Sequence, residues 1–243
     1  MLSIPIALIG LLDDLSDISI KYRFLIQLLT AFVLTYYSKV VLNFSNPVSS
    51  ILSLLIYFFL VLMIVSIINF VNFMDGIDGL VTGTMAIIFL VIGITFSHSG
   101  FIVFSSLLAF LYWNWQPSKI FMGDVGSTFL GSVFGGLLLN SGSLNLSISI
   151  ILIASPLFAD AFFTVIRRFK YKKNIFAAHK SHLYQRLHQN GFSHSVISIG
   201  YILAVSFLGF AYLLLGLDFL IFFAIILLMF GLYLDSKVAK TFI

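Results

Sequence analysis

The sequence predicts an all-α, polytopic integral membrane protein with about eight full transmembrane helices. Of its 243 residues, 60% are hydrophobic and only 9% are charged. A soluble domain carries charge on roughly a quarter of its residues. The apolar residues also form long runs, several of which approach the ~20 residues that a helix needs to cross a bilayer. Composition and run length therefore indicate the same fold class.

The individual helices follow from the apolar runs in chain order. Residues 1–12 have the composition of the last part of a span and are too short to cross alone, so a partial helix is expected there. The runs at 100–115 and 126–141 are short, and we expect them to tilt or to extend into the flanking motifs. Full spans are expected at 24–42, 50–70, 79–97, 100–115, 126–141, 146–166, 195–215 and 217–234.

The chain is expected to form one transmembrane domain over 1–243, with a basic, histidine-containing loop at 167–194 inside it. Every Lys and Arg except Lys39 falls in five segments that helix alternation places on one side of the membrane. Because cytoplasmic loops carry an excess of Lys and Arg, that side is predicted to be the cytoplasm, and the membrane the inner or cytoplasmic one. The five segments are 13–23, 71–78, 116–125, 167–194 and 235–243.

Composition also limits the function. The net charge is +4, but the basic residues flank membrane spans, so no nucleic-acid partner is expected. The chain has no cysteine, which excludes disulfides and thiolate metal sites. All of its acidic residues are aspartates, and several lie beside glycines in short polar islands. Short carboxylates in such places suggest a rigid site for a hard cation and phosphate oxygens.

The first island is the pair Asp13-Asp14, which closes an apolar run. Two interpretations have equal weight. The pair is either a charged turn at a helix end, or a catalytic pair in which one carboxylate binds a cation and the other positions or deprotonates a nucleophile. Lys21 either binds an anion or anchors the helix at the interface, and for Arg23 we favour anchoring.

The second island contains Asn69, Asn72 and Asp75 at three-residue spacing, followed by Asp78 and Gly79. Helical spacing places the first three on one face. Their amide and carboxylate oxygens suit a hard cation or the polar edge of a nucleotide. Gly79 permits a close backbone approach. The alternative is a helix end with solvated aspartates.

The third island places Asp124 between Gly123 and Gly126, at the start of a predicted helix. Glycines at a helix N-terminus leave backbone N–H groups free for a phosphate, and Asp124 would hold a metal against it. The alternative is simple N-capping by Asp124 or Ser127.

The fourth island lies in the 167–194 loop and contains His179, His182 and Arg186. On a helix these three residues share a face, which predicts a cationic surface for a phosphate. A basic patch that touches anionic lipid is the alternative. His188 and His194 have no evident partner in the sequence and are expected to be surface residues.

The four islands, in this order, resemble the motifs of the polyprenyl-phosphate N-acetylhexosamine-1-phosphate transferases. The resemblance covers essentially the whole chain, and the family includes the enzymes that start peptidoglycan, teichoic-acid and O-antigen synthesis. It implies transfer of a sugar-1-phosphate from a UDP-sugar to undecaprenyl or another polyprenyl phosphate, with Mg2+ (or Mn2+) and release of UMP. A membrane location is implied, and a homodimer is left open.

The resemblance also implies roles for residues at matching positions. Asp124, together with Asn72, would be a metal ligand, and Asp75 would belong to the catalytic site. Asp13 and Asp14 would bind or activate the lipid phosphate. The remaining predicted substrate-binding residues are Asn69 and Lys21, Asp78 on the uridine side, and His179, His182 and Arg186 at the diphosphate.

Two departures from the family pattern affect these expectations. The chain begins about two spans later than family members do, so a fragment or a truncated reading frame is one interpretation. The late loop has a sparser histidine cluster than the peptidoglycan members and the common GlcNAc-type members have. It is more similar to loops of O-antigen or capsule initiators, including those that use 6-deoxy-N-acetylhexosamines. Donor choice is therefore predicted to reside in 170–194.

Two other classes of function remain as alternatives. Intramembrane Asp and Asn residues mark ion paths in transporters and channels. Here the carboxylates gather on one face of the membrane and no internal repeat is visible, which disfavours a transporter. An inactive, truncated homologue that acts as a scaffold is the second alternative.

Overall fold

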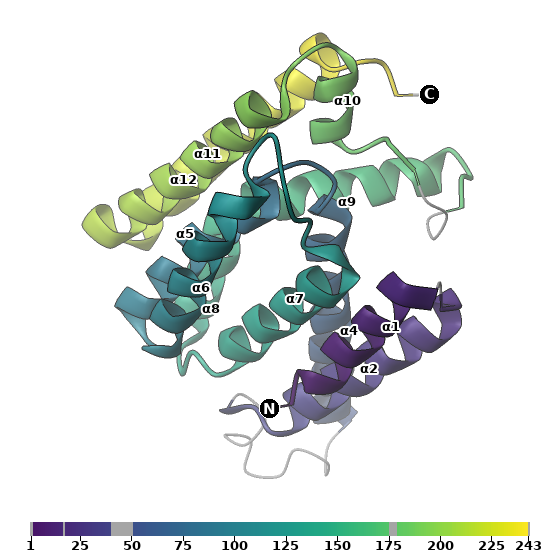
Figure 1. The fold of residues 1–243 in the computed structure, drawn as a ribbon. Helices are drawn as coiled ribbons and strands as arrows, with labels where there is room; N and C mark the ends of the chain where they lie inside the picture. Colours follow the sequence, from purple (N-terminus) through teal and green to yellow (C-terminus); the bar gives the residue numbers. More distant parts are fainter. Residues whose placement is uncertain (1, 17, 40–50, 175–178, 243) are drawn as a thin grey trace. The chain divides into compact units, whose positions relative to one another are not determined.

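The computed structural model describes residues 2–16, 18–39, 51–174 and 179–242, which form helices and connecting turns without any strand (Figure 1). The helices group into two compact units. Unit 1 comprises Met1–Asn72 and Met122–Ser147, and unit 2 comprises Phe73–Phe121 and Ile148–Ile243.

Unit 1 is built around the packing of its first helix on a later one. Helix α1 packs against α7 and α2, and α2 also contacts α7. Gly10 makes the close α1–α7 approach, because a Cβ there would lie 2.7 Å from the Cα of Val125. Small residues at such crossings let membrane helices pack backbone to backbone. The helices of unit 1 are α1 (Ile4–Ser16), α2 (Ile20–Tyr36), α4 (Ile51–Met74) and α7 (Gly123–Leu139).

Unit 2 has α5 at its centre, packed against both α6 and α11. Helix α12 contacts α11 and α9, and the short α10 contacts α9, α11 and a π-helical turn, η1. The α5–α6 contact depends on Gly100, where a Cβ would lie 2.5 Å from the backbone nitrogen of Gly93. The helices are α5 (Leu80–Thr95), α6 (Ser99–Asn114), α8 (Leu144–Ile153, which begins in unit 1), α9 (Ser155–Lys170), α10 (Leu183–Gln189), α11 (His194–Leu215), α12 (Leu217–Tyr233) and η1 (Leu234–Val238).

The predicted span at 146–166 is the main departure from the expected helices. It consists of two helices, α8 and α9, bent by 76° relative to each other. Pro156 lies in the first turn of α9. A proline has no N–H and its ring clashes with the carbonyl four residues earlier, so one continuous helix is disfavoured. Sequence hydropathy does not report this break, because both halves are apolar.

The described helices support a polytopic membrane protein. Three of them are long and apolar enough to cross a bilayer, Ile51–Met74, His194–Leu215 and Leu217–Val238, and the bent α8–α9 pair adds a fourth if it forms one span. Helices α5, α6 and α7 are apolar but shorter. Large apolar side chains such as Phe219, Phe222 and Met229 are exposed along α12, as expected for lipid contact. The membrane fold is confirmed, and the number of eight full spans stays a prediction.

Candidate functional site

Asp14 caps the N-terminus of α7. Its two carboxylate oxygens accept hydrogen bonds from the backbone N–H groups of Asp124 at 2.9 Å and Val125 at 3.1 Å. Gly123 makes room for this cap, because its φ is +65° and a Cβ there would lie 2.5 Å from an Asp14 oxygen. We expected these N–H groups to bind a substrate phosphate. The structure corrects that expectation, since the anion at this helix end is the chain's own carboxylate.

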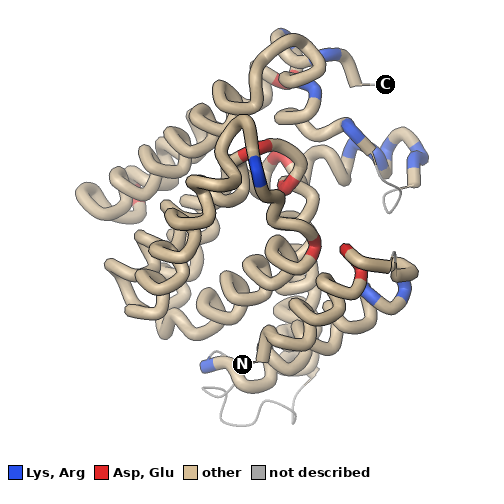
Figure 2. The backbone as a smooth tube through the Cα atoms, in the orientation of Figure 1, with Lys and Arg blue, Asp and Glu red and all other residues tan. Residues whose placement is uncertain are grey.

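Asp13 faces a different partner. A single nitrogen of Arg23, Nη1, contacts Oδ2 of Asp13 and lies 2.9 Å from Oδ2 of Asp124. The side chains of Asp13, Asp124 and Arg23 are 10%, 25% and 29% exposed, so the group is accessible from solvent. Figure 2 shows the acidic residues at the end of α1 and at the start of α7. Arg23 thus pairs with two carboxylates, and its favoured role as an interface anchor stays a prediction. The pair Asp13-Asp14 divides into a partner of Arg23, Asp13, and a helix cap, Asp14.

Asn72 completes this cluster on the α4 side. Its Nδ2 donates to Oδ1 of Asp124 at 2.9 Å and to Oγ of Ser127 at 3.0 Å. Asn69, one helical turn earlier, donates instead to Oε1 of Gln27 at 2.8 Å, which ties α4 to α2. The structure thus brings Asn72 to Asp124 as predicted for a metal-binding pair, and it places Asn69 in a helix contact. We call Asp13, Arg23, Asn72 and Asp124 the unit 1 cluster.

The donors of the unit 1 cluster fit a hard divalent cation. Two carboxylates converge on one positively charged nitrogen, and an amide lies against one of them. Within the described residues, no group of three or more His, Asp or Glu side chains forms a metal cage. Mg2+ needs no such cage, because it is commonly held by one or two carboxylates together with waters and substrate phosphates.

In unit 2, the loop between α4 and α5 is fixed by Asp78. The Oδ1 of Asp78 accepts a hydrogen bond from Ser118 Oγ at 2.9 Å, and His194 Nδ1 lies 3.4 Å from its Oδ2. The rings of His194 and His188 lie 4.4 Å apart. Both histidines were expected to be surface residues without partners. His188 is exposed as expected and His194 is partly buried, and the structure corrects the lack of partners for both. Asp75 directly follows α4 and is half-buried.

Asp160 forms the most buried carboxylate network of unit 2. Its carboxylate accepts hydrogen bonds from the N–H groups of Leu183 at 2.7 Å and Tyr184 at 3.1 Å, and from the Tyr201 hydroxyl at 2.8 Å. His182 Nδ1 lies 3.5 Å from Oδ1. The Asp160 side chain is only 2% exposed. A residue of α9 therefore caps α10 and lies against the predicted diphosphate-binding histidine.

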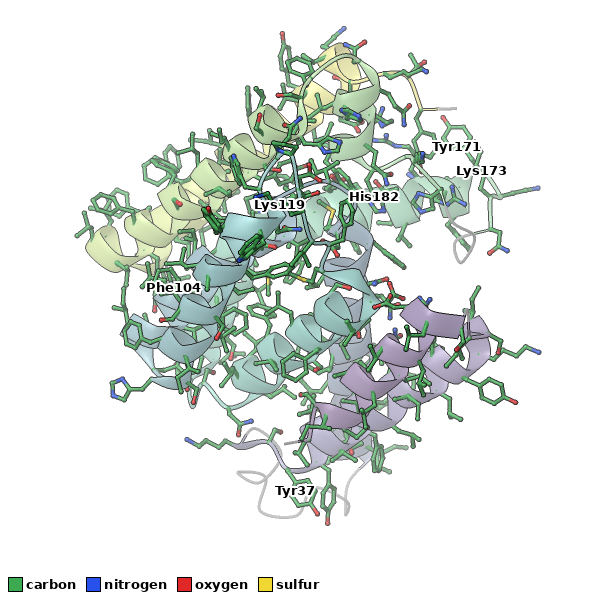
Figure 3. All side chains as sticks on the ribbon, in the orientation of Figure 1. Tyr37, Phe104, Lys119, Tyr171, Lys173 and His182 are labelled. Atoms are coloured by element: carbon green, nitrogen blue, oxygen red, sulfur yellow. The ribbon has the colours of Figure 1, made fainter. Side chains whose placement is uncertain are left out.

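His179, His182 and Arg186 do not share a helix face, contrary to our expectation. Helix α10 begins at Leu183, and His182 is its N-cap residue. The rings of His179 and His182 nevertheless stack with centroids 4.9 Å apart, and His182 also stacks on Tyr184. Figure 3 labels His182 among the side chains. Burial, followed by the neighbouring charges of His182 and Arg168, lowers the pKa of His179 to about 4. His179 is therefore neutral at neutral pH.

Arg186 is directed toward the C-terminal part of unit 2. Its guanidinium pairs with Asp235 in η1, and its Nη1 donates to the carbonyl of Lys240 at 2.8 Å. Its residue exposure is only 3%, and this burial lowers its pKa. Arg167 of α9 also donates to Asp235. Arg186 thus joins α10 to η1, and its predicted contact with a diphosphate stays a prediction.

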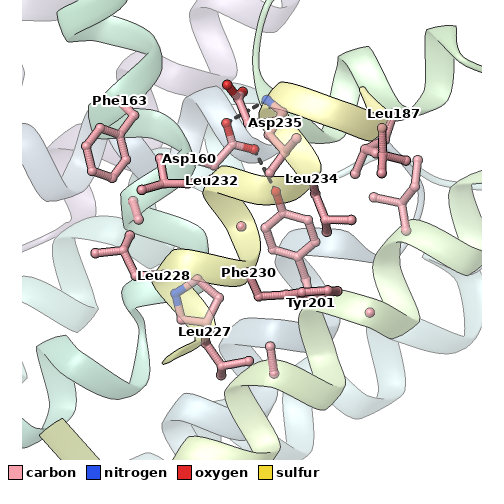
Figure 4. Close-up of a pocket in the computed structure, with 18 of the residues that line it drawn as sticks. Asp160, Phe163, Leu187, Tyr201, Leu227, Leu228, Phe230, Leu232, Leu234 and Asp235 are labelled. Carbon is pink, nitrogen blue, oxygen red and sulfur yellow. Dashed lines mark hydrogen bonds between the residues drawn. The ribbon is translucent and has the colours of Figure 1, made fainter. Parts of the chain in front are cut away.

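Unit 2 also contains a cavity of about 500 Å³ between α9, α11 and α12 (Figure 4). Its wall is mainly apolar, with Phe163, Leu228 and Phe230 among the lining residues. Asp160 and Asp235 lie at its polar end, where Figure 4 shows the bond from Tyr201 to Asp160. An apolar cavity of this kind can accept a hydrocarbon chain.

Sequence reasoning did not name Asp160 and Asp235, and it did not find the partners of Arg23 and His194. Asp160 left a usable signal, since a lone carboxylate inside a predicted span requires a partner. The other three left none, because their partners lie ten to over a hundred residues away in the chain. Exposed Lys21 was predicted to bind substrate, and this stays a prediction.

Comparison with known proteins agrees with the order of the motifs. The family model described as "Glycosyl transferase family 4" matches residues 1–142, which is more than half of the chain. The matched stretch contains all members of the unit 1 cluster.

Individual relatives have related names. A Bacillus subtilis (strain 168) protein, "Probable undecaprenyl-phosphate N-acetylglucosaminyl 1-phosphate transferase", is 35% identical over 222 residues, covering 83% of this chain and 62% of the relative. A Thermotoga maritima "Undecaprenyl-phosphate alpha-N-acetylglucosaminyl 1-phosphate transferase" is 29% identical over 182 residues, covering 75% of this chain and 58% of the relative. A Streptomyces coelicolor "Phospho-N-acetylmuramoyl-pentapeptide-transferase" is 62% identical over 32 residues, 13% of this chain and 9% of the relative. The chain thus spans less than two thirds of the length of these relatives.

Proposed function

The chain belongs to glycosyl transferase family 4, and on that premise we propose that it transfers a sugar-1-phosphate from a UDP-sugar to undecaprenyl or another polyprenyl phosphate. The proposed sugar is an N-acetylhexosamine or a 6-deoxy-N-acetylhexosamine. UMP is the second product. The reaction would be the first membrane step of a cell-envelope polysaccharide, on the cytoplasmic side of the cell membrane. The names of the two longer matches, which both specify N-acetylglucosaminyl 1-phosphate transfer to undecaprenyl phosphate, support this proposal.

The proposed chemistry is a direct displacement at phosphorus. An oxygen of the lipid phosphate attacks the phosphorus that bears the sugar, and the bond from that phosphorus to the bridging oxygen breaks. The bridging oxygen leaves with UMP. The second pKa of a phosphate monoester is near 6, so the acceptor is largely ionised at neutral pH and needs no strong base. A covalent aspartyl intermediate is therefore unnecessary.

The observation that carries the proposal is the convergence of Asp13 and Asp124 on one position in the unit 1 cluster. The reaction brings several phosphate charges together, and a divalent cation bound there would neutralise charge as it develops. Asp124 and Asp13 are proposed to hold that cation, Mg2+ or Mn2+, with the amide of Asn72 beside them. Arg23 would supply a further positive charge.

The cavity of unit 2 supports a lipid substrate. Its apolar wall suits an isoprenoid chain, and Arg167 lies among the lining residues at its polar end. At that end Arg167 already pairs with Asp235, so the cavity is proposed to hold the hydrocarbon part of the lipid and not its phosphate. The exposed apolar helices place such a cavity within reach of membrane lipid.

The test is UMP release by the purified 243-residue chain in detergent. The assay contains undecaprenyl phosphate, Mg2+ and a panel of UDP-sugars, with Asp124→Asn as the inactive comparison. Release that requires the lipid, the metal and Asp124 supports the proposal and identifies the donor. Absence of release with every donor, while the upstream coding region also fails to restore it, contradicts it.

The one-step route has its own test. Incubation with a donor labelled in the transferred phosphate, without acceptor lipid, should leave the protein unlabelled. A labelled phospho-enzyme that disappears in Asp13→Asn would overturn direct displacement.

Exchange of the 170–194 loop between two members with different donors tests the proposed location of donor choice. That location is abandoned if donor preference does not change.

A further inference from the structure

The unit 1 cluster contains a geometric conflict between Arg23 and a metal ion. Oδ2 of Asp13 and Oδ2 of Asp124 both contact the same nitrogen of Arg23. A Mg2+ ion lies about 2.0–2.1 Å from its oxygen ligands. An ion bound by both oxygens would lie close to the guanidinium nitrogen, and two cations that close together repel each other.

The cavity beside the guanidinium is small. The adjoining cavity measures about 10 Å³ and is lined by Arg23, Asp124, Gln27 and Thr128, with three apolar or small residues of α1. That volume is close to the minimum for a single water molecule. A hydrated divalent ion cannot enter there beside Arg23. The other oxygen of Asp124 is bound by Asn72.

We propose that Arg23 and the divalent cation compete for the carboxylates of Asp13 and Asp124, and that metal binding releases the Arg23 guanidinium toward the substrate phosphates. The inference rests on the proposed function, whose metal site it uses. Arg23 alone leaves the two carboxylates with a net negative charge. The cation reverses that sign while Arg23 stays nearby, so the cluster attracts a phosphate only after the metal has bound.

Competition by Arg23 and positioning of the carboxylates by Arg23 predict opposite effects on metal binding when Arg23 is removed. When a binding-competent state is only partly populated, the apparent affinity falls by that fraction. Removing Arg23 should therefore tighten metal binding, although it removes a residue of the cluster. If Arg23 instead positions the carboxylates for the metal, its removal should weaken binding.

The experiment measures Mn2+ binding to the purified chain in detergent by EPR of the free ion, without donor or lipid. For Arg23→Gln we expect the Kd for Mn2+ to fall by about tenfold. This value corresponds to a wild-type chain in which the carboxylates are free of Arg23 in about one tenth of the molecules. Lys21 lies two residues before Arg23, and its side chain is exposed. Lys21→Gln removes the same charge and should change the Kd for Mn2+ far less. Arg23→Lys, which keeps the charge without the planar fork, should fall between Arg23→Gln and wild type.

The outcomes separate this inference from the proposed function. An unchanged or higher Kd in both Arg23 variants overturns the competition, and so does failure of every variant to bind Mn2+. If Lys21→Gln tightens binding as much as Arg23→Gln, general charge explains the effect and the inference fails. If the size-exclusion profile shows that Arg23→Gln does not fold, the Kd of Arg23→Lys tests the inference.

The second half of the inference concerns catalysis. Arg23→Gln should bind Mn2+ more tightly and yet turn over more slowly, because no guanidinium is released to the phosphates. Tighter binding with undiminished turnover would overturn this half. Absence of UMP release that the upstream coding region does not restore contradicts the proposed function, while the Mn2+ measurement still decides the competition.

Discussion

The carboxylates of the unit 1 cluster and the carboxylate of Asp160 in unit 2 are the same chemical group in different environments. Asp13 and Asp124 share one guanidinium and are 10% and 25% exposed. Asp160 is 2% exposed and accepts two backbone N–H bonds and a tyrosine hydroxyl bond. A buried carboxylate with this many donors is an anchor, since removing it leaves several groups unpaired. A partly exposed pair held by one cation can exchange that cation for another.

The largest expected effect tests the unit 1 side of the comparison. Asp124→Asn should lower kcat by about 10²–10³-fold or more, because it removes a charge that would hold the proposed cation. It should change stability little, since the asparagine still fits beside Asn72. UMP release and thermal unfolding in detergent measure the two effects.

The control for that variant is Asp218→Asn, which changes an exposed aspartate in the first turn of α12. It should retain full turnover. Equal losses in the two variants would show that the effect of Asp124 is not specific to the cluster.

The second prediction tests the anchor. Asp160→Ala should destabilise the protein by about 2–4 kcal/mol, because it removes a helix cap and leaves buried donors unpaired. Asp160→Asn keeps an acceptor and should lose less. Tyr201→Phe removes a single donor and should cost about 1 kcal/mol. Denaturant unfolding measures all three, and a wild-type stability for Asp160→Ala would contradict the anchor role.

The third prediction concerns the adjacent residues Asp13 and Asp14. Asp14→Ala should cost about 1 kcal/mol of stability, because it removes the cap of α7. Asp13→Ala should leave stability nearly unchanged and should abolish most turnover. Unfolding and UMP release on both variants check this division. The reverse pattern, with Asp13 stabilising and Asp14 dispensable for stability, would contradict it.

The smallest expected effect is a pH dependence from His179. Its folded-state pKa is about 4, below the ordinary value of 6.5. Between these values the unfolded chain binds a proton that the folded chain does not, so stability rises with pH across that window. The side chain is only half-buried, and we expect no more than about 1 kcal/mol after screening.

Comparison of His179→Gln with wild type tests this effect. The stability difference between pH 7.5 and pH 5 should be smaller in the variant than in wild type. A difference that is unchanged by the substitution would show that other groups cause the pH dependence.

Much of the fold followed from the sequence alone. Hydropathy located most of the described apolar helices to within a few residues, because a spanning segment must be apolar over its whole length. Helix α2 covers Ile20–Tyr36 and not the expected 24–42. The 146–166 run is divided by the break before Pro156 into α8 and α9. The apolar pattern is the same for one helix or two, so only the backbone geometry separates them.

The candidate site was predicted less completely. The order of the motifs predicted that Asp13, Asn72 and Asp124 belong to one site, and the structure places these three in one cluster. It did not separate Asp14 from Asp13, because neighbouring residues of the same type look alike until the helix directs one toward the α7 N-terminus and the other toward Arg23.

The sequence by itself determined that this chain is a helical membrane protein with acidic motifs in the order of its family, since composition, run length and motif order are properties of the linear chain. Tertiary structure decided which carboxylate caps a helix, which shares a guanidinium and which is buried as an anchor. Those roles depend on pairings such as Asp14 with Val125 or Asp160 with Tyr201, across 111 and 41 residues. Interactions over such separations depend on how the helices pack, and no local pattern in the sequence encodes them.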